Sequence, residues 1–291
     1  MEWTESIRRA IEYMEKHLLE DISATEISET VYISPFYLQK GFKMMTGYTL
    51  GEYIRGRRLY MAALDVIANK EKIIDLAYKY GYDTPESFTK AFSRFHGVSP
   101  KQIQGDVGKI KTFLPLRITI SIKGGNEMDY VIEKMDGMKI IGFVKEVPYE
   151  NSYNIIPSFW RDFCSEFCNR RNNKQVQNVI EQCCIGEFGV CISDINNDKS
   201  FKYIIAGKYN GGEVPEGMEV FNIPSLKWAK FKCIGPMPEA LQAVNTRVFN
   251  EWIPGNPEYE ISEPMNIEWY SKGDGSSTDY ESEIWVPVKR K

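Results

Sequence analysis

The hydrophobic and polar positions of the first hundred residues repeat at an offset of fifty. The stretch "VYISPFYLQKGFKMMTGYT" (31–49) aligns with "GYDTPESFTKAFSRFHGVS" (81–99). Tyrosine, proline, lysine, phenylalanine and glycine recur at matching positions, and the apolar Leu38 is matched by Phe88. Self-similarity at a fixed offset indicates one supersecondary unit that occurs twice.

Each copy is predicted to consist of two short helices joined by a turn. In the first copy, Ser23 and Glu26 have the spacing of a capping box, and Ser34 precedes a proline that begins the second helix. In the second copy, Asp83 or Thr84 takes the capping role. A helix–turn–helix whose second helix keeps a polar outer face suits the major groove of DNA.

The second helix of the first copy separates into two faces. Its apolar face is predicted to consist of Phe36, Leu38, Phe42 and Met45. The positions left to point outward are Tyr37, Gln39, Lys40 and Lys43.

Between the copies, "TLGEYIRGRRLYMAALDVIAN" predicts a single helix from about Leu50 to Ala68. Its inward positions are Leu59, Ala62, Ala63, Val66 and Ile67. At 1.5 Å per residue this helix spans roughly 28 Å, close to the ~34 Å of one DNA turn. One chain is therefore expected to contact two successive grooves. The cations expected to neutralise phosphates are Arg55, Arg57 and Arg58.

The pattern changes after Gln104, where glycines, a proline and period-2 runs replace helical spacing. We expect a linker over residues 106–111 between a domain of residues 1–105 and a domain of residues 112–291. In the second domain, runs such as "YVIEKMDGMKIIGFVKEV" predict strands, and "SYNIIPSFWRDFCSEFCNRR" and "MPEALQAVNTRVFNEWIP" predict two helices. A terminal pair of strands completes an α+β domain with an antiparallel sheet.

Charge supports this division. The net charge of −4 argues against a protein that coats nucleic acid indiscriminately. However, residues 1–105 hold 14 basic and 14 acidic side chains, so the negative excess lies in the rest of the chain. Residues 31–63 hold five basic side chains against Glu52 alone. The cations are concentrated where a surface for DNA is expected.

The sequence contains no membrane or secretion signal. No apolar run approaches the roughly 20 residues that a membrane span needs. The start, "MEWTESIRRAIEYMEKHLLE", lacks the basic beginning and apolar centre of a secretion signal. We expect a cytoplasmic protein without a membrane partner.

Cysteine and histidine usage predicts no catalytic residue, no metal and no cofactor. The six cysteines all lie in the second half and are expected to be reduced, acting as small apolar side chains. Cys164 and Cys168 are spaced i,i+4 on a predicted helix, which leaves a soft-metal or thiol-sensing site open. His17 and His96 are the only histidines, so neither a zinc signature nor a Ser-His-Asp arrangement forms.

Residues 1–105 resemble the DNA-binding domain of the AraC/XylS transcription regulators, particularly the MarA/SoxS/Rob branch. The phrases "LQKGFK", "TGYTLGEYIRGRRL" and "IIDLAYKYGYDTPESFTKAFSRFHGVSP" carry the resemblance. It implies an all-α double helix–turn–helix domain with double-stranded promoter DNA and RNA polymerase as partners. Activation is the family's usual effect.

The resemblance also implies which side chains read DNA. In the first unit it places Phe36, Gln39 and Lys40 at base-reading positions, and Tyr37, Lys43, Arg55 and Arg57 complete the expected surface. In the second unit it points to Pro85, Glu86, Thr89, Lys90 and Arg94. Glu86 departs from the amide common in that branch. Because a carboxylate accepts a hydrogen bond from cytosine N4 but repels phosphate, the preferred sequence should differ here.

Residues 112–291 resemble the GyrI-like effector-binding domain found in Rob-type and BmrR-type multidrug regulators. "SFWRDF", "YIIAG", "IPSLKWAKFKCIGPMPEALQ", "EWIP" and "IEWY…YESEIWVPV" carry this resemblance in a characteristic order. In that family the sheet forms a cup lined by aromatic side chains with a buried acid at its base. The acid matches Glu268, and the lining aromatics match Tyr280, Trp160, Tyr203 and Trp228.

The physics of such a site favours a cationic or lipophilic small-molecule effector. A buried carboxylate is costly unless it is paired, and a cationic ligand supplies the partner. Tyrosine and tryptophan faces add cation–π attraction. The leading hypothesis is therefore a transcription regulator that binds DNA with its first domain and senses a ligand with its second.

Two other functions remain open for the second domain. Some GyrI-like domains resemble hydrolases of small electrophiles, which use an acid in the pocket to activate water. In this chain such roles would fall to Glu268, Tyr280 and Trp160. Others resemble protein inhibitors of a topoisomerase, which would make the domain a protein-interaction module. We expect a regulator rather than an enzyme.

Overall fold

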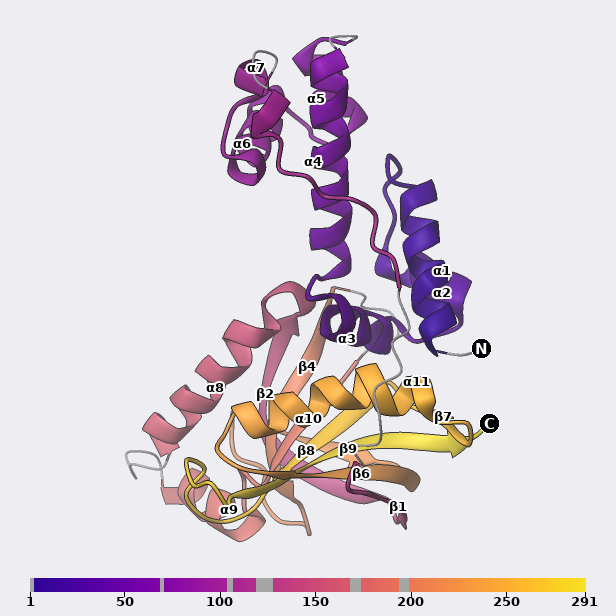
Figure 1. The fold of residues 1–291 in the computed structure, drawn as a ribbon. Coiled ribbons are helices and arrows are strands. Elements are labelled where there is room, and N and C mark those ends of the chain that lie inside the picture. The colour runs from indigo at the N-terminus through magenta and orange to yellow at the C-terminus, as the bar shows by residue number, and fades with distance from the viewer. Residues whose placement is uncertain (1–2, 69–70, 104–106, 119–127, 168–173, 194–198) are drawn as a thin grey trace. The chain divides into compact units, whose positions relative to one another are not determined.

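The computed structural model describes residues 3–68, 71–103, 107–118, 128–167, 174–193 and 199–291. The chain divides into two compact units, Met1–Ile122 and Lys123–Lys291 (Figure 1). Cys168, named above as a candidate thiol, lies outside the described residues. The first unit is helical and the second is built on one antiparallel sheet, so the predicted fold class is confirmed.

The first unit contains two helix–turn–helix pairs on a shared connecting helix. The pairs are α2 with α3 and α5 with α6, and α4 connects them (Figure 1). The described helices are α1 (Trp3–Lys16), α2 (Ala24–Val31), α3 (Pro35–Thr46), α4 (Leu50–Ala68), α5 (Ile73–Lys79), α6 (Pro85–His96) and α7 (Pro100–Ile103), followed by the short 3-10 helix η1 (Val107–Lys109).

The predicted repeat is confirmed at the level of helix ends. Helices α3 and α6 begin at prolines fifty residues apart, and the side chains of Ser34 and Thr84 cap their N-termini. Both helices end at a glycine in the left-handed region, Gly47 at φ 80° and Gly97 at φ 79°. A side chain at either glycine would be strained, because residues other than glycine seldom adopt this conformation. The capping box at Ser23 is present as well.

The residue with positive φ lies one position earlier in the second turn than in the first, relative to the offset of fifty. The first turn passes through Tyr32 at φ 56°, and the second passes through Gly81 at φ 80°. Both turns are closed by the same kind of backbone hydrogen bond, from Ile33 to Ser28 and from Tyr82 to the carbonyl of residue 77. The second copy therefore has one more residue between its turn and its second helix.

The predicted connecting helix is confirmed from Leu50 to Ala68. Four of its five predicted inward residues are buried in the core of the second pair, and Ile67 is partly buried against it. That core also contains Phe88 and Phe92 of α6. Helices α4 and α6 are thus fixed to each other by packing.

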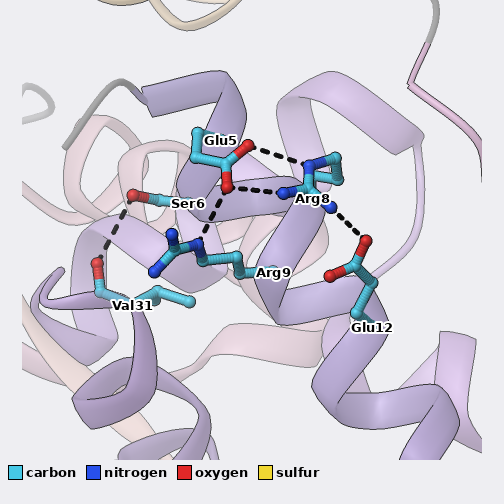
Figure 2. Close-up of polar contacts among 6 residues, drawn as sticks. All are labelled: Glu5, Ser6, Arg8, Arg9, Glu12 and Val31. Atoms are coloured by element: carbon cyan, nitrogen blue, oxygen red, sulfur yellow. Dashed lines mark hydrogen bonds and ion pairs between the residues drawn. The ribbon is translucent and has the colours of Figure 1, made fainter.

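Helix α1 packs on α2 through its apolar side and carries charges on its exposed side. Figure 2 shows Glu5 bonded to both Arg8 and Arg9, with Arg8 also contacting Glu12. The Ser6 hydroxyl donates a long hydrogen bond of 3.4 Å to the Val31 carbonyl at the end of α2. Exposed ion pairs contribute little stability, so these surface charges are not what holds α1 in place.

Residues 107–118, which we call the return segment, pack on the helical unit. Figure 1 shows this segment running back beside α4 after α7. Its Phe113 ring contacts Tyr48, Tyr53 and Phe95. The predicted division between a linker at 106–111 and a second domain from 112 therefore differs from the structure, where the units divide at Ile122.

The second unit contains one antiparallel sheet with helices. The described strands are β1 (Tyr130–Met135), β2 (Met138–Pro148), β3 (Phe188–Ile192), β4 (Ser200–Lys208), β5 (Met218–Ile223), β6 (Leu226–Ile234), β7 (Tyr259–Ile261), β8 (Met265–Tyr270) and β9 (Glu281–Arg290). The described helices are η2 (Tyr149–Asn151), α8 (Ser152–Phe167), α9 (Lys174–Cys183), α10 (Glu239–Arg247), η3 (Val248–Trp252) and α11 (Ile253–Gly255).

The strand order consists of two similar halves on either side of the β3–β8 pair. It runs β1-β6-β9-β8-β3-β4-β2-β5, with β7 also pairing with β9. Each half of the unit gives a strand, then helices, then two strands. The first half is β2, α8, α9, β3 and β4, and the second is β6, α10, η3, α11, β8 and β9, with the short β7 added. The halves meet where β3 pairs with β8. The preceding strands are exchanged, since β1 pairs with β6 and β5 with β2. Glu268 lies on β8, next to this central junction.

The two faces of the sheet have different surroundings. One face carries an apolar cluster that includes Val190, Trp228 and Trp285. The other face is covered by helices, because α8 packs on β2, and Trp252 of η3 lies 4.9 Å from the Phe231 ring of β6. Glu268 belongs to the helix-covered face, since its neighbour Ile267 belongs to the apolar cluster and side chains alternate along a strand.

Candidate functional site

The outer face of α6 presents a row of polar side chains. Glu86, Lys90 and Arg94 are exposed and four residues apart, which aligns them along one side of the helix. Pro85 and Thr89 are half-buried beside this row. Because Phe88 and Phe92 anchor the opposite side, the row has a defined direction. The structure therefore brings together all five residues predicted for the second reading helix.

Helix α3 presents a different surface. Gln39, Lys40 and Lys43 are half-buried, and Lys40 Nζ lies 5.7 Å from the Phe36 ring centroid. Phe36 is buried, as its apolar spacing predicted, and this corrects the base-reading position that the resemblance implied for it. Tyr37 was predicted to point outward but is 1 % exposed, with its ring edge-on to Phe36 at 5.0 Å. The expected outward position of Tyr37 is thus wrong for this structure.

The arginines of α4 do not act alike. Arg55 is exposed, which is compatible with a phosphate contact. Arg57 is 5 % exposed, and its guanidinium makes two hydrogen bonds of 2.8 and 2.9 Å to Glu15. Arg58 donates to two carbonyl oxygens after α1, those of Leu18 at 2.6 Å and Glu20 at 2.5 Å. The prediction that Arg57 and Arg58 neutralise phosphates is corrected, because both guanidinium groups are used inside the unit.

Lys43 also has an internal partner. Its Nζ lies 3.0 Å from Glu52 Oε2, and the same carboxylate oxygen accepts from the Thr49 amide at the start of α4. The Glu52 pKa is lowered by these hydrogen bonds, even though burial opposes the shift. Any contact of Lys43 with DNA would have to compete with this pair.

In the second unit, Glu268 accepts two phenolic hydrogen bonds on one oxygen. Tyr203 of β4 and Tyr270 of β8 donate to its Oε2 at 2.7 and 2.8 Å. Trp160 of α8 in turn donates its indole N–H to the Tyr203 oxygen at 2.8 Å. The sheet and a covering helix therefore meet in one hydrogen-bonded network.

A glycine on the neighbouring strand leaves room for this network. Gly189 of β3 lies directly opposite Glu268 in the strand register. A Cβ at this position would lie 2.8 Å from Glu268 Oε2 and would collide with the Tyr203 hydroxyl. Glycine is thus required here by close approach of side chains rather than by a special backbone angle.

Aromatic rings surround the carboxylate. Trp160 and Tyr270 lie edge to face with ring centroids 5.0 Å apart, and Phe159 and Phe163 of α8 contact Tyr203 and Trp160 respectively. Burial, followed by the nearby Glu268 charge, raises the pKa of both Tyr203 and Tyr270 well above the usual range. Both phenols therefore remain protonated donors at neutral pH.

A basic partner for Glu268 is missing from the described part of the chain, where no lysine, arginine or histidine nitrogen lies within ion-pair distance of it. The carboxylate is half-buried, and the polar contacts it makes are the hydrogen bonds from Tyr203 and Tyr270. A half-buried carboxylate lined by aromatic rings favours a cation that carries aromatic or apolar groups.

The other two predicted lining residues lie elsewhere. Trp228 is 1 % exposed within the apolar cluster on the opposite face of the sheet, so its predicted place beside Glu268 is corrected. Tyr280 lies just before β9 rather than within it and donates its hydroxyl to the Ser271 carbonyl at 2.8 Å. It closes the loop between β8 and β9, and its role as a ligand contact stays a prediction.

Tyr270 was missed by the sequence reasoning. The signal was present, because residues two apart on a strand share a face and "EWY" places Tyr270 beside Glu268.

No described helix is long and apolar enough to cross a membrane, and no group of three or more metal-ligating side chains was found among the described residues.

The matches to protein families follow the two units. The profile described as an integron-associated effector binding protein matches residues 131–288, and a helix-turn-helix domain profile matches residues 27–105. Together with the geometry above, these matches define a DNA-binding transcription regulator with an effector-binding domain. The chain belongs to the AraC-type helix-turn-helix regulators and, through residues 131–288, to the GyrI-like integron-associated effector-binding family.

Relatives support the first half of this assignment. The multiple antibiotic resistance protein MarA of Salmonella typhimurium is 31% identical over 113 residues, which are 38% of this chain and 89% of MarA. The transcriptional activator AarP of Providencia stuartii is 34% identical over 94 residues, 32% of this chain and 70% of AarP. The uncharacterized regulator YbfP of Bacillus subtilis is 30% identical over 142 residues, 49% of this chain but only 44% of YbfP.

Among solved structures, SAV2435 bound to tetraphenylphosphonium resembles part of the chain with a TM-score of 0.44 and 22% identity. The similarity covers 56% of this chain and 94% of SAV2435. The families found are those of regulators rather than enzymes.

Proposed function

We propose that this protein activates transcription from promoters that it contacts through α3 and α6, and that a lipophilic cation bound at Glu268 controls it. The proposed DNA-contacting surface of α6 consists of Glu86, Thr89, Lys90 and Arg94. Helix α3 contributes Gln39 and Lys40. Arg55 adds a phosphate contact. The buried Phe36 and Tyr37 do not belong to this surface.

The observation that carries the sensing role is the state of the Glu268 carboxylate. It is half-buried, it accepts two phenolic hydrogen bonds on one oxygen, and it has no basic partner among the described residues. A ligand cation gains the attraction of this charge together with contacts to Trp160 and Tyr270. An anionic ligand would be repelled, because the nearby phenol and indole hydrogens are already donated.

Activation is the proposed sign because the AraC-type relatives include AarP, which is a transcriptional activator. RNA polymerase is the protein partner that this activating role implies. The ligand can change transcription only if it binds one conformational state of the protein better than another.

Thermal unfolding of the full chain tests ligand binding. Tetraphenylphosphonium is expected to raise the melting temperature in a concentration-dependent way, since a ligand that binds the folded state stabilises it by mass action. The neutral triphenylphosphine oxide, of similar size and aromaticity, is the control and should have a much smaller effect. Equal shifts with both compounds would refute selection for a cation, and turnover of small electrophiles added in their place would favour a hydrolase.

A further inference from the structure

The return segment contacts both helix–turn–helix pairs. The Phe113 ring lies edge to face with Tyr48, at the end of the first pair, with centroids 5.2 Å apart. It also lies edge to face with Phe95 of α6, in the second pair, at 5.8 Å. One side chain outside the repeat therefore bridges its two copies.

The backbone at Phe113 is tied to α4 and, through α4, to α1. Arg57 Nη1 donates to the Phe113 carbonyl at 2.6 Å, while its other nitrogens hold Glu15 of α1. Glu15 also accepts from the Tyr53 hydroxyl at 2.6 Å. The Leu116 amide donates to that hydroxyl oxygen at 3.3 Å. The burial of Arg57 thus serves this junction.

A second contact lies two residues earlier in the chain, at Lys111, and joins the segment to the C-terminus of α6. The Lys111 amide donates to His96 Nδ1 at 3.1 Å, and His96 Nε2 donates to the Leu59 carbonyl of α4 at 3.1 Å. The Lys111 ammonium lies 4.8 Å from the Phe95 ring centroid. Ile110 packs against the core of the second pair.

Helix α4 leaves a gap that the Phe113 ring occupies. Gly56 lies in the middle of α4, where glycine weakens a helix relative to alanine. A Cβ built on Gly56 would lie 2.9 Å from Phe113 Cε1 and 3.1 Å from its Cζ. The absence of a side chain at residue 56 therefore allows the ring to seat against the helix.

We infer that the return segment positions the two reading helices relative to each other, with Phe113 and Gly56 as its central contact. This inference rests on the proposed contact of α3 and α6 with two successive grooves. Linked DNA-binding units gain affinity over either unit alone only when their geometry lets both engage at once. Holding them in the bound orientation before DNA arrives reduces the ordering cost of binding.

Binding of full-length variants to matched duplexes tests this role. The probe is a duplex enriched from a random-sequence pool by the wild-type chain, together with two versions in which one half-site or the other is scrambled. Phe113→Ala is expected to lower affinity for the intact duplex by about tenfold and for each half-site duplex by less than about twofold. Gly56→Ala should act in the same direction, although alanine is the better helix former.

Leu114→Ala is the matched control, because Leu114 adjoins Phe113 but is 64 % exposed. It should bind all three duplexes as the wild type does. A Phe113→Ala variant that stays folded and loses affinity equally on all three duplexes, or on none, overturns the inference. A wild-type chain that binds each half-site duplex as tightly as the intact one instead refutes the two-groove function itself.

Discussion

At the scale of single residues, the proposed ligand preference of the second unit depends on the Glu268 carboxylate. It shares one oxygen between Tyr203 and Tyr270, and its charge has no basic partner in the described residues. Glutamine at this position can still accept both phenolic hydrogen bonds but carries no charge. The ligand preference and the hydrogen-bonded network can therefore be separated by a single substitution.

Glu268→Gln is expected to weaken tetraphenylphosphonium binding by more than about tenfold, because desolvated charge attraction is lost while the aromatic contacts remain. Isothermal titration calorimetry of the full chain measures this directly. Glu187→Gln is the control, since Glu187 is a carboxylate that accepts from the Trp269 indole at 3.0 Å on the opposite side of β8. Unchanged affinity in Glu268→Gln, or equal losses in both variants, would contradict the assigned role.

His96 gives a pH dependence to the return segment. Burial lowers the His96 pKa; the hydrogen bond to the Leu59 carbonyl opposes this shift, and the positive charge of Lys111 adds to it. The neutral ring is required, because Nδ1 accepts the Lys111 amide hydrogen. The unfolded chain binds a proton at a higher pH than the folded chain does. The free energy of unfolding therefore falls as pH falls below about 6.5.

Hydrogen exchange of the Lys111 amide tests this dependence. After correction for the intrinsic exchange rate, its protection is expected to be constant above about pH 7 and to fall on acidification below about pH 6.5. His17→Gln should leave this profile unchanged, as the other histidine lies at the end of α1. A flat protection profile in the wild type would show that His96 stays neutral or does not hold Lys111.

Residue roles that depend on distant partners could not be predicted from the sequence. Arg57 was expected on phosphate because it lies in an arginine-rich helix, yet its partner Glu15 is 42 residues away. Trp228 was expected beside Glu268, but strand alternation places it on the opposite face. Hydrogen bonds join Tyr203, Trp160 and Glu268, which the family resemblance had named together, and their role in ligand binding stays a prediction.

At the scale of elements, the local signals for helix ends were sufficient. Ser34 and Thr84 cap, the following prolines begin each helix, and Gly47 and Gly97 end it, all within single turns of the chain. The return segment had no such signal. Its place depends on Gly56, Arg57 and His96, which contact it from α4 and α6, so it was assigned to a linker and to the next domain.

The exposed row on α6 predicts how DNA affinity depends on salt. Lys90→Ala is expected to weaken binding and to reduce the slope of log affinity against log salt by about one, if this lysine contacts a phosphate. Lys79→Ala of α5 is the matched control, because Lys79 is held by Asp65 at 2.8 Å and Glu71 at 2.7 Å. Binding measured over a salt series compares them. An unaltered slope in Lys90→Ala would remove Lys90 from the DNA surface.

At the scale of the whole molecule, one chain combines two helix–turn–helix pairs with an effector-binding domain. The 19 residues of α4 extend for about 28 Å and carry both helix–turn–helix pairs. Successive major grooves on one side of a duplex are ~34 Å apart. The central claim is that this spacing lets a single chain contact both grooves.

Hydroxyl-radical footprinting of the full chain on a selected duplex, with the stoichiometry fixed at one chain per duplex, measures this most directly. The predicted result is two protected segments on one face of the DNA, centred about 10 base pairs apart. Protection confined to one segment, or two segments that appear only with a second bound chain, would contradict it.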